Sequence, residues 1–382
     1  MAINEGRFCV FCGKTPDGKT REHVIPYWLL EMTGDPKRVV AFGQDFARGK
    51  KAIRYSWSNY VAPACDRCNN RFSKLEDQIK PMVETLQRRE SLSVGDYVEL
   101  LNWLDKIRIG VWVIRHMIEN YPTTITPNFY IDARIAQKDR MVALYVFESD
   151  NKGLNLFGAD SLIFNDMPSC FGLRINDILL INASSDFFCS AGCGFPHPAT
   201  MKLQMGGDQS GKMTLEDFRY SVEIKHPITS IRLFKPVVWL YQPIAMPSTN
   251  PIFQGGFQGH FNLSDSRLAG LRMQGSDRQG ALFRQFSDGV QIHRSLSDRI
   301  DFDEVGGKDA AMQKDIAASV YDSQIVMFDS VRYEWHMPAS QRKFEKAYRK
   351  MKREHTEQLA MMYRAGAAAL AGGTTMARAG RK

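Results

Sequence analysis

Two Cys-x2-Cys pairs near the N-terminus constrain the fold more than any other feature of this chain. The first pair is Cys9 and Cys12, and the second is Cys65 and Cys68. Each pair has the spacing of a zinc knuckle, and four thiolates complete a closed tetrahedral site. The metal can tie together a segment that is too short to form a hydrophobic core. The pairs therefore predict a structural Zn²⁺, with buried free thiols or two disulfides as the alternatives.

A histidine beside a carboxylate lies between the two pairs, in the string REHVIP at residues 21–26. Asn59 stands a few residues before the second pair, and Asn69 comes directly after Cys68. Over roughly residues 7–80, this order of motifs resembles the zinc-stapled HNH endonucleases. The resemblance implies an N-terminal, treble-clef-like ββα-metal unit. In such a unit a β-hairpin carries the histidine, a loop carries the middle Asn, and a helix starts at the last motif residue.

The resemblance also implies a role for each motif residue. His23 would be the general base, because a neutral imidazole with a pKa near ~6.5 can accept a proton from water at neutral pH. Phosphodiester hydrolysis also needs a cation that neutralises the charge developing on the phosphate and on the leaving oxygen. Glu22 and Asn69 offer hard oxygen ligands and are predicted to hold this cation, Mg²⁺ or Mn²⁺. Asn59 would orient the strand of His23 through hydrogen bonds.

Other roles are open for some of these residues. Asn69 at a helix start could be an N-cap, and Asn59 could be a plain turn residue. Family members more often carry Asp at the position of Glu22 and a basic residue at the position of Phe72. The second hypothesis is therefore a non-catalytic zinc module that binds nucleic acid or another protein.

Helical periodicity follows the second cysteine pair. A helix is predicted over 69–86, with Pro81 bending it or dividing it in two. Glu76 on this helix would orient the histidine, pair with Arg21, or simply face solvent. A longer helix with one apolar stripe is predicted over 93–120, where it would cover the nuclease unit with a hydrophobic core.

The character of the chain changes after Pro122. Short β-branched and aromatic runs bounded by Gly, Asn, Asp and Pro predict an antiparallel, β-rich region over 125–245. Residues 248–310 are expected to be loop-rich or partly helical, and 339–370 helical, with the last dozen residues disordered. The predicted strands are Met141–Phe147, Ser161–Phe164, Cys170–Ile175, Ile178–Ile181, Tyr220–Lys225 and Val237–Tyr241.

At 382 residues the chain is expected to form two to three domains of an α+β protein. Residues 1–122 would form the HNH nuclease domain with its zinc site and covering helices. Within it, 27–32 is predicted to be a short helix and 37–58 a basic surface insertion between the hairpin strands. Residues 123–338 would form a β-rich domain that selects substrate, senses a signal, or binds a partner, which could be another protein or a second copy of the chain. Residues 339–382 would form a basic helical tail.

The charge is unevenly distributed along the chain. The formal net charge is +8, and the sequence pI is about 9.0. Residues 341–382 contain eleven Lys and Arg and three Glu, a net +8, and residues 1–90 contain sixteen basic and eleven acidic residues, a net +5. The remaining middle is acidic by five charges. Two basic ends suit a protein that grips phosphates in two places, so DNA is the expected partner, in preference to RNA.

Cysteine usage and hydropathy bound the cellular setting. Four of the seven cysteines lie in knuckles, which fits a reducing compartment better than a disulfide framework. No apolar run has the length of a membrane span, and the first residues lack the pattern of a signal peptide, so a cytoplasmic protein without membrane contact is expected. Cys189, Cys193 and His197, with Cys170 as a fourth ligand, suggest a second metal site. Ordinary buried thiols are the favoured interpretation.

Together, these observations predict a metal-dependent HNH-type endonuclease that acts on DNA. A nuclease joined to a larger unassigned domain is a common arrangement in restriction, phage-defence and mobile-element proteins. A role in phage defence or in a mobile element is predicted from that analogy alone.

Overall fold

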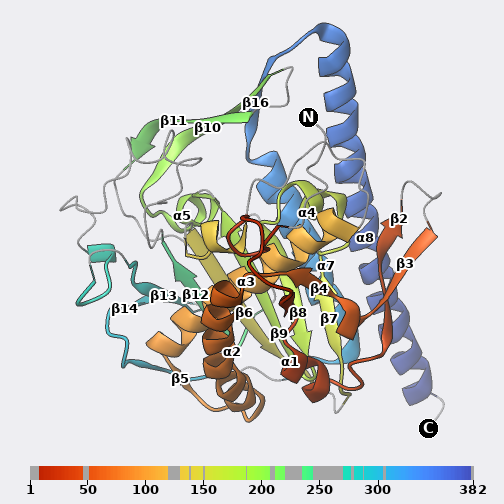
Figure 1. Cartoon of the computed structure of the whole chain (residues 1–382). Helices are drawn as coiled ribbons and strands as arrows, with labels where there is room; N and C mark the ends of the chain where they lie inside the picture. The colour runs from red at the N-terminus through yellow and green to blue at the C-terminus, as the bar shows by residue number, and fades with distance from the viewer. Residues whose placement is uncertain are drawn as a thin grey trace.

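The computed structural model describes residues 8–45, 51–118, 130–136, 139–148, 151–185, 187–206, 211–219, 235–243, 270–276, 279–286, 288–303 and 307–379. A seven-stranded antiparallel sheet forms the centre of this described part (Figure 1). From one edge to the other, its strands are β14 (Val290–His293), β13 (Leu282–Gln285), β12 (Val238–Gln242), β6 (Asp139–Val146), β9 (Ile178–Ser185), β8 (Cys170–Ile175) and β7 (Leu154–Phe157).

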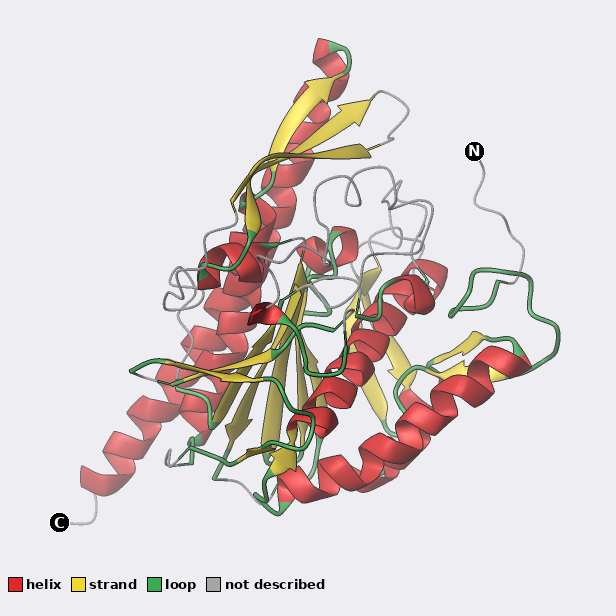
Figure 2. Cartoon of the chain, turned by 90° about the vertical axis from the view of Figure 1, so that its left-hand side faces the viewer, coloured by secondary structure: helices red, strands yellow, loops and turns green. Residues whose placement is uncertain are grey.

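Both faces of this sheet are covered by helices, as Figure 2 shows. In β6, Val142 and Leu144 belong to a hydrophobic cluster shared with α3 (Val94–Ile118). Ala143 lies between them and belongs to a second cluster, shared with α7 (Ala310–Asp329). Successive side chains of a strand point to opposite faces. A strand buried on both faces therefore has a nearly continuous apolar sequence, as β6 does.

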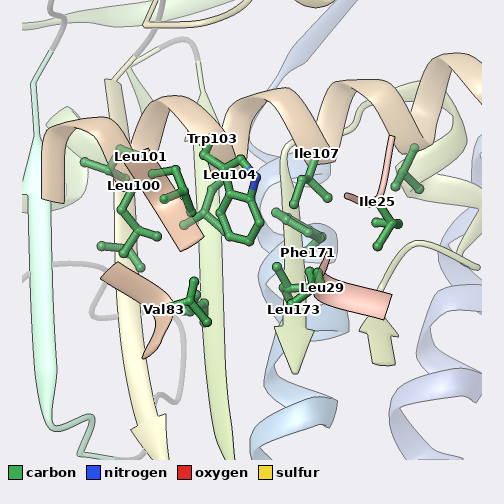
Figure 3. Packing of buried hydrophobic residues seen from close by; sticks show 14 of the residues in the cluster. Ile25, Leu29, Val83, Leu100, Leu101, Trp103, Leu104, Ile107, Phe171 and Leu173 are labelled. Carbon is green, nitrogen blue, oxygen red and sulfur yellow. The ribbon is translucent and has the colours of Figure 1, made fainter. Parts of the chain in front are cut away.

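Helix α3 crosses one face of the sheet and supplies much of the core there. Figure 3 shows Trp103, Leu104 and Ile107 of α3 directed toward the layer that contains Phe171 and Leu173 of β8. All five side chains are fully buried. Full burial of such a side chain is worth roughly 1.5–3 kcal/mol, so this contact is a major source of stability.

The same hydrophobic cluster extends into the N-terminal unit. It contains Phe11 and Leu29 as well as Leu144 of the sheet, so residues on both sides of the predicted boundary at 122 share one core. A short strand pair adds a second link, between β5 (Leu92–Ser93) and β15 (Arg299–Ile300). The part of the chain that carries the cysteines is therefore anchored directly on the sheet layer.

The N-terminal unit contains a short hairpin followed by a helix. Strand β1 (Arg21–His23) pairs antiparallel with β4 (Val61–Pro63), and α2 (Asp66–Gln87) follows. The helices predicted over 27–32 and 69–86 are confirmed, and Pro81 does not divide α2. Between β1 and β4 lie α1 (Tyr27–Met32), β2 (Val39–Asp45), β3 (Lys51–Ser56) and the 3-10 turn η1 (Trp57–Asn59).

The predicted surface insertion is a hairpin of its own. Strands β2 and β3 pair antiparallel with each other, with a bulge between Ala41 and Gln44. In Figure 1 this hairpin projects from the side of the molecule. The insertion therefore interrupts the sequence between β1 and β4 without preventing their pairing.

A second, smaller sheet stands beside the last helix. Strand β10 (His197–Gly206) pairs antiparallel with β11 (Gly211–Arg219) and parallel with β16 (Arg332–His336). Helix α8 (Ala339–Ala379) begins just after β16 and packs along α7. Figures 1 and 2 show the small sheet next to the N-terminal part of α8, beyond one end of the central sheet.

Some of the predicted elements differ from the structure. Ser161–Phe164 is not a strand, because the Ser161 hydroxyl accepts the N–H of Phe164 at 2.9 Å and caps helix α4 (Leu162–Asp166). Helix α7 is absent from the predicted elements, since it is buried almost all round and lacks an amphipathic pattern. Two further short elements are η2 (Ile131–Ala133) and α5 (Phe188–Cys193).

Two expectations are only partly addressed. The predicted strand at 220–225 lies outside the described residues, and α8 continues through Ala379 into the stretch expected to be disordered. Helix and strand occur together in an α+β arrangement, as predicted. Among the described helices, none is both long enough and apolar enough to cross a lipid bilayer.

Candidate metal centre and functional site

The four knuckle cysteines converge on one point. Their sulfur atoms all lie within 4.8 Å of one another, and Cys12 Sγ is 3.9 Å from Cys65 Sγ. Four sulfurs placed about 2.3 Å from a tetrahedral Zn²⁺ would be separated by about 3.8 Å. The arrangement of Cys9, Cys12, Cys65 and Cys68 therefore fits a closed structural zinc site, and no disulfide joins them.

Backbone geometry at each knuckle explains this convergence. In the first knuckle, the N–H of Gly13 donates to the carbonyl of Cys9 at 2.8 Å, with Gly13 at a φ of +74°. A Cβ at Gly13 would also lie 2.1 Å from the Tyr130 ring, so only glycine fits there. In the second knuckle, Cys65 is the N-cap residue of α2, and its N–H donates to Cys9 Sγ at 3.3 Å.

The electrostatics of the cluster call for a cation. Burial and the neighbouring Cys9 and Cys12 thiols raise the pKa of Cys68 to about 12. Burial also opposes ionisation of Cys9, although backbone N–H groups near it lower its pKa overall. Four thiolates this close repel one another in the absence of positive charge. A bound Zn²⁺ supplies that charge and deprotonates coordinating thiols.

His23 ends strand β1 on the half-exposed side of the hairpin. Its ring meets the Tyr27 ring edge-on, with the centroids 5.8 Å apart. Within the described part of the chain, no hydrogen bond restrains the imidazole. The next residue, Val24, packs closely against Gly110 of α3. A Cβ added at Gly110 would lie 2.7 Å from Val24 Cγ1. Helix α3 thus fixes the end of the strand while the His23 ring stays accessible.

Glu22 has a different environment from His23. Its side chain is buried, and Lys106 Nζ of α3 donates to Glu22 Oε1 at 2.5 Å. Lys106 is fully buried and also donates to Glu76 Oε1 of α2. One ammonium group therefore lies between two carboxylates, where β1, α2 and α3 meet.

This triad has strongly perturbed acid–base properties. Burial and the Glu22 carboxylate raise the pKa of Glu76 to about 7, against the lowering effect of Lys106. Burial by itself would lower the pKa of Lys106, but the two carboxylates raise it above its ordinary value. The ammonium therefore stays charged at neutral pH and occupies the position of a cation between the two acids.

Asn69 lies in the first turn of α2, next to the zinc cluster. Its N–H donates to the carbonyl of Cys65 at 2.9 Å, and its side chain is partly exposed. Cys65 is the N-cap residue, so the N-cap alternative for Asn69 is wrong. Among the described residues, no hydrogen bond engages the Asn69 amide, which leaves its oxygen available as a ligand.

Asn59 is the last residue of η1, and Tyr60 separates it from β4. Its side chain is exposed and makes no hydrogen bond to a residue that the structure describes. The predicted hydrogen bonds from Asn59 to the strand of His23 therefore stay a prediction. The structure brings the four cysteines, His23, Glu22 and Asn69 into one unit built from β1, β4 and α2.

Lys106 is a residue that the sequence analysis misses. The sequence signal for it is a lysine inside the apolar stretch of the helix predicted over 93–120, where charged residues are rarely buried unless they are paired. The sequence alone does not identify the partner of Glu76, because Arg21 is an equally reasonable candidate. In the structure Glu76 pairs with Lys106.

The second metal hypothesis receives no support. Cys189 and Cys193 are buried beside Asp139, and burial raises the pKa of both thiols. The ring of His197 instead makes a hydrogen bond at Nδ1 to the carbonyl of Phe195, 2.5 Å away. Within the described residues, the knuckle cysteines are the only group of three or more Cys, His, Asp or Glu close enough to share a metal.

Replacing Lys106 by methionine is expected to lower the free energy of unfolding by about 3–5 kcal/mol at pH 8, because it leaves the buried carboxylate of Glu22 and the partly buried one of Glu76 without a counter-charge. A carboxyl group with a raised pKa binds its proton more tightly in the folded state than in the unfolded chain. The loss of stability should therefore shrink as the pH falls from 8 to 5. Urea unfolding of wild type and variant across this range measures the effect.

Two further variants separate charge from packing in this test. Lys80→Met removes an exposed lysine of α2 and should change the unfolding free energy by no more than about 0.5 kcal/mol. Adding Glu22→Gln and Glu76→Gln to Lys106→Met removes the repulsion and should restore part of the stability. A loss for Lys106→Met that is equal at every pH would contradict the ion-pair interpretation.

The candidate site thus combines a four-cysteine cluster, an accessible imidazole on the adjoining strand, and a buried Lys–Glu–Glu triad. Each part is defined by contacts of the chain itself. Comparison of this chain with models of known protein families, with curated proteins and with solved structures finds no match.

Proposed function

We propose that this protein is a metal-dependent HNH-type endonuclease that hydrolyses phosphodiester bonds in DNA. The supporting observation is the placement of His23 and Asn69 on one strand–strand–helix unit whose base is closed by the four-cysteine cluster. This is the arrangement that the resemblance to HNH endonucleases implies. A role in phage defence or in a mobile element stays a prediction from analogy.

In the proposed reaction, the neutral imidazole of His23 accepts a proton from a water molecule, whose oxygen attacks the phosphorus atom. The bond to the 3′ oxygen breaks, and that oxygen leaves with the displaced electron pair. A bound Mg²⁺ or Mn²⁺ supplies positive charge to the phosphate and the leaving oxygen. The half-exposed position of His23 lets the ring reach a substrate without any unfolding of the hairpin.

Asn69 and Glu22 would hold the divalent ion. Both offer hard oxygen atoms, and water and phosphate oxygens would complete the six ligands that Mg²⁺ requires. Asn69 is free for this role among the described residues. Oε1 of Glu22 is paired with the Lys106 ammonium. Glu22 would therefore bind the divalent ion through Oε2, or through Oε1 after the ammonium has moved away.

The pairing of Glu22 with Lys106 also favours a second candidate function. If the ammonium keeps this carboxylate permanently, the unit lacks one ligand for a catalytic ion. The protein would then be a non-catalytic, zinc-stabilised module that binds nucleic acid or another protein. The two functions differ in whether a phosphodiester bond is cut.

Incubation of zinc-loaded protein with supercoiled plasmid separates the two functions. The endonuclease is expected to convert the plasmid to nicked or linear forms with Mg²⁺ or Mn²⁺ and to leave it intact when no divalent ion is added. Labelled single-stranded RNA added as competitor should inhibit less than duplex DNA does. DNA binding without cleavage under every metal would support the non-catalytic module instead.

A further inference from the structure

The first three turns of α8, residues 339–349, contain four basic residues and one acidic residue. Residues 341–382 have a net charge of +8, which equals the net charge of the whole chain. Figure 1 shows this end of α8 beside β10, β11 and β16, beyond the end of the central sheet.

Several basic residues of α8 are already engaged in packing. The Arg349 guanidinium lies 3.5 Å from the centroid of the Tyr333 ring and 4.0 Å from that of Phe328. Lys352 is buried and forms an ion pair with Asp166 of α4. These two contacts fix the inner side of α8 against the body of the protein.

Other basic residues of α8 have acidic partners at the surface. Arg353 lies 3.4 Å from Asp329 and 3.1 Å from Glu357. Lys350 lies 3.6 Å from Glu354, four residues later on the same helix. Exposed pairs of this kind reduce the charge available to an external anion.

Three basic residues of α8 have no such acidic partner among the described residues. Arg342, Lys343 and Lys346 are exposed, and none forms an ion pair with a residue that the structure describes. Arg342 and Lys346 are four residues apart, about 6 Å along the helix axis, and so lie on the same side of α8. We call these three residues the basic face.

We propose that the basic face binds the sugar–phosphate backbone of DNA, at a place separate from the cleavage centre. This inference rests on the proposed function for its choice of polyanion. A DNA backbone presents closely spaced charges to any row of cations, and such contacts need no sequence recognition. The three unpaired cations match that requirement.

A membrane surface fits the same helix less well. Binding to a lipid surface requires a continuous apolar side that can enter the bilayer interface. The apolar side of α8 is packed against α7 and α4, and Ala360 and Ala367 on it are buried. Within residues 339–349, where the basic residues lie, Phe344 is the only exposed large apolar side chain, and the others on α8 follow farther along the helix at Met351, Met361, Met362 and Leu370.

The position of the basic face has a consequence for the length of DNA that is bound. Helices α7 and α8 cover one face of the central sheet, whereas α3 and the zinc unit cover the other. One DNA molecule that touches both the basic face and His23 must therefore extend well beyond the scissile phosphate. Affinity should rise with duplex length until both places are reached.

The test compares two triple variants by fluorescence anisotropy, with a labelled 40-base-pair duplex and no divalent ion. The first variant is Arg342→Gln, Lys343→Gln and Lys346→Gln. The control is Lys152→Gln, Lys235→Gln and Arg294→Gln, which removes three exposed charges elsewhere. Each lost phosphate contact lowers the slope of log affinity against log salt by about 0.9.

Wild type and control are expected to lose affinity for DNA when the salt rises from 50 to 200 mM. The factor of this loss should be about 40 times larger than for the basic-face variant, as three lost contacts require. At saturating DNA, nicking by the variant should equal that of wild type. A salt slope unchanged from wild type overturns the proposal, as does tighter binding to vesicles of anionic lipid than to DNA. If no protein nicks DNA but the slope still falls, the nuclease proposal fails and the basic face stands.

Discussion

Replacing Cys65 by serine is expected to reduce the zinc content from one ion per chain to none and to unfold the hairpin that carries His23. Four thiolates would hold the ion, and Cys65 would contribute one of them and is also the N-cap residue of α2. Structural zinc sites bind with apparent free energies of about 10–16 kcal/mol, which become folding free energy when the apo unit is unstructured. Elemental analysis and hydrogen exchange of β1, β4 and the first turn of α2 measure the two effects.

The expected unfolding is local. The sheet and α3 share a large core that does not depend on the metal, so far-UV circular dichroism should change far less than exchange in the hairpin. Cys193→Ala is the matched control, because that thiol is buried outside the cluster and should leave the zinc content at one. A Cys65→Ser protein that still binds one zinc per chain would contradict the assignment of the cluster.

The features that sequence reasoning predicts well are local in the chain. The Cys-x2-Cys spacing predicts that each pair can share a metal. The apolar pattern predicts the helices at 27–32 and 69–86. The pairing of β1 with β4 is what the resemblance to HNH endonucleases implies, and it is found in the structure. None of these elements needs information about the rest of the molecule.

The features that it misses depend on contacts between distant segments. Helix α7 has no polar side because the sheet covers one flank of it and α8 another, so its periodicity is lost. Ser161 is followed by an apolar run that reads equally well as strand or helix, and the capping hydrogen bond decides for the helix. For α7 the local sequence does not contain the deciding contacts, whereas the capping hydrogen bond of Ser161 spans only three residues and is a signal that the apolar pattern alone overlooks.

The candidate site shows the same division. The knuckles place Cys9, Cys12, Cys65 and Cys68 around one point, as the motif spacing predicts. The pairing of Glu22 with Lys106 joins residues 84 positions apart, and only the packing of α3 on the hairpin brings them together. A motif predicts the residue types at a site, but tertiary packing determines which other side chain pairs with each of these residues.

The substitution His23→Ala is expected to lower the rate of plasmid nicking by about 10²- to 10⁴-fold, the usual contribution of a general base. The side chain is half-exposed and makes no hydrogen bond to a described residue, so the fold should tolerate its removal. Zinc content and DNA affinity should therefore match those of wild type. His336→Ala, which removes an exposed imidazole on β16, should nick DNA at the wild-type rate.

The single-turnover nicking rate of zinc-loaded wild type and His23→Ala, measured with saturating plasmid and Mg²⁺ or Mn²⁺, tests the central claim most directly. A zinc-closed hairpin that presents His23 to a phosphodiester predicts nicking by wild type and a loss of at least about 100-fold in the variant. Equal nicking rates for the two proteins, at equal zinc content, would contradict it.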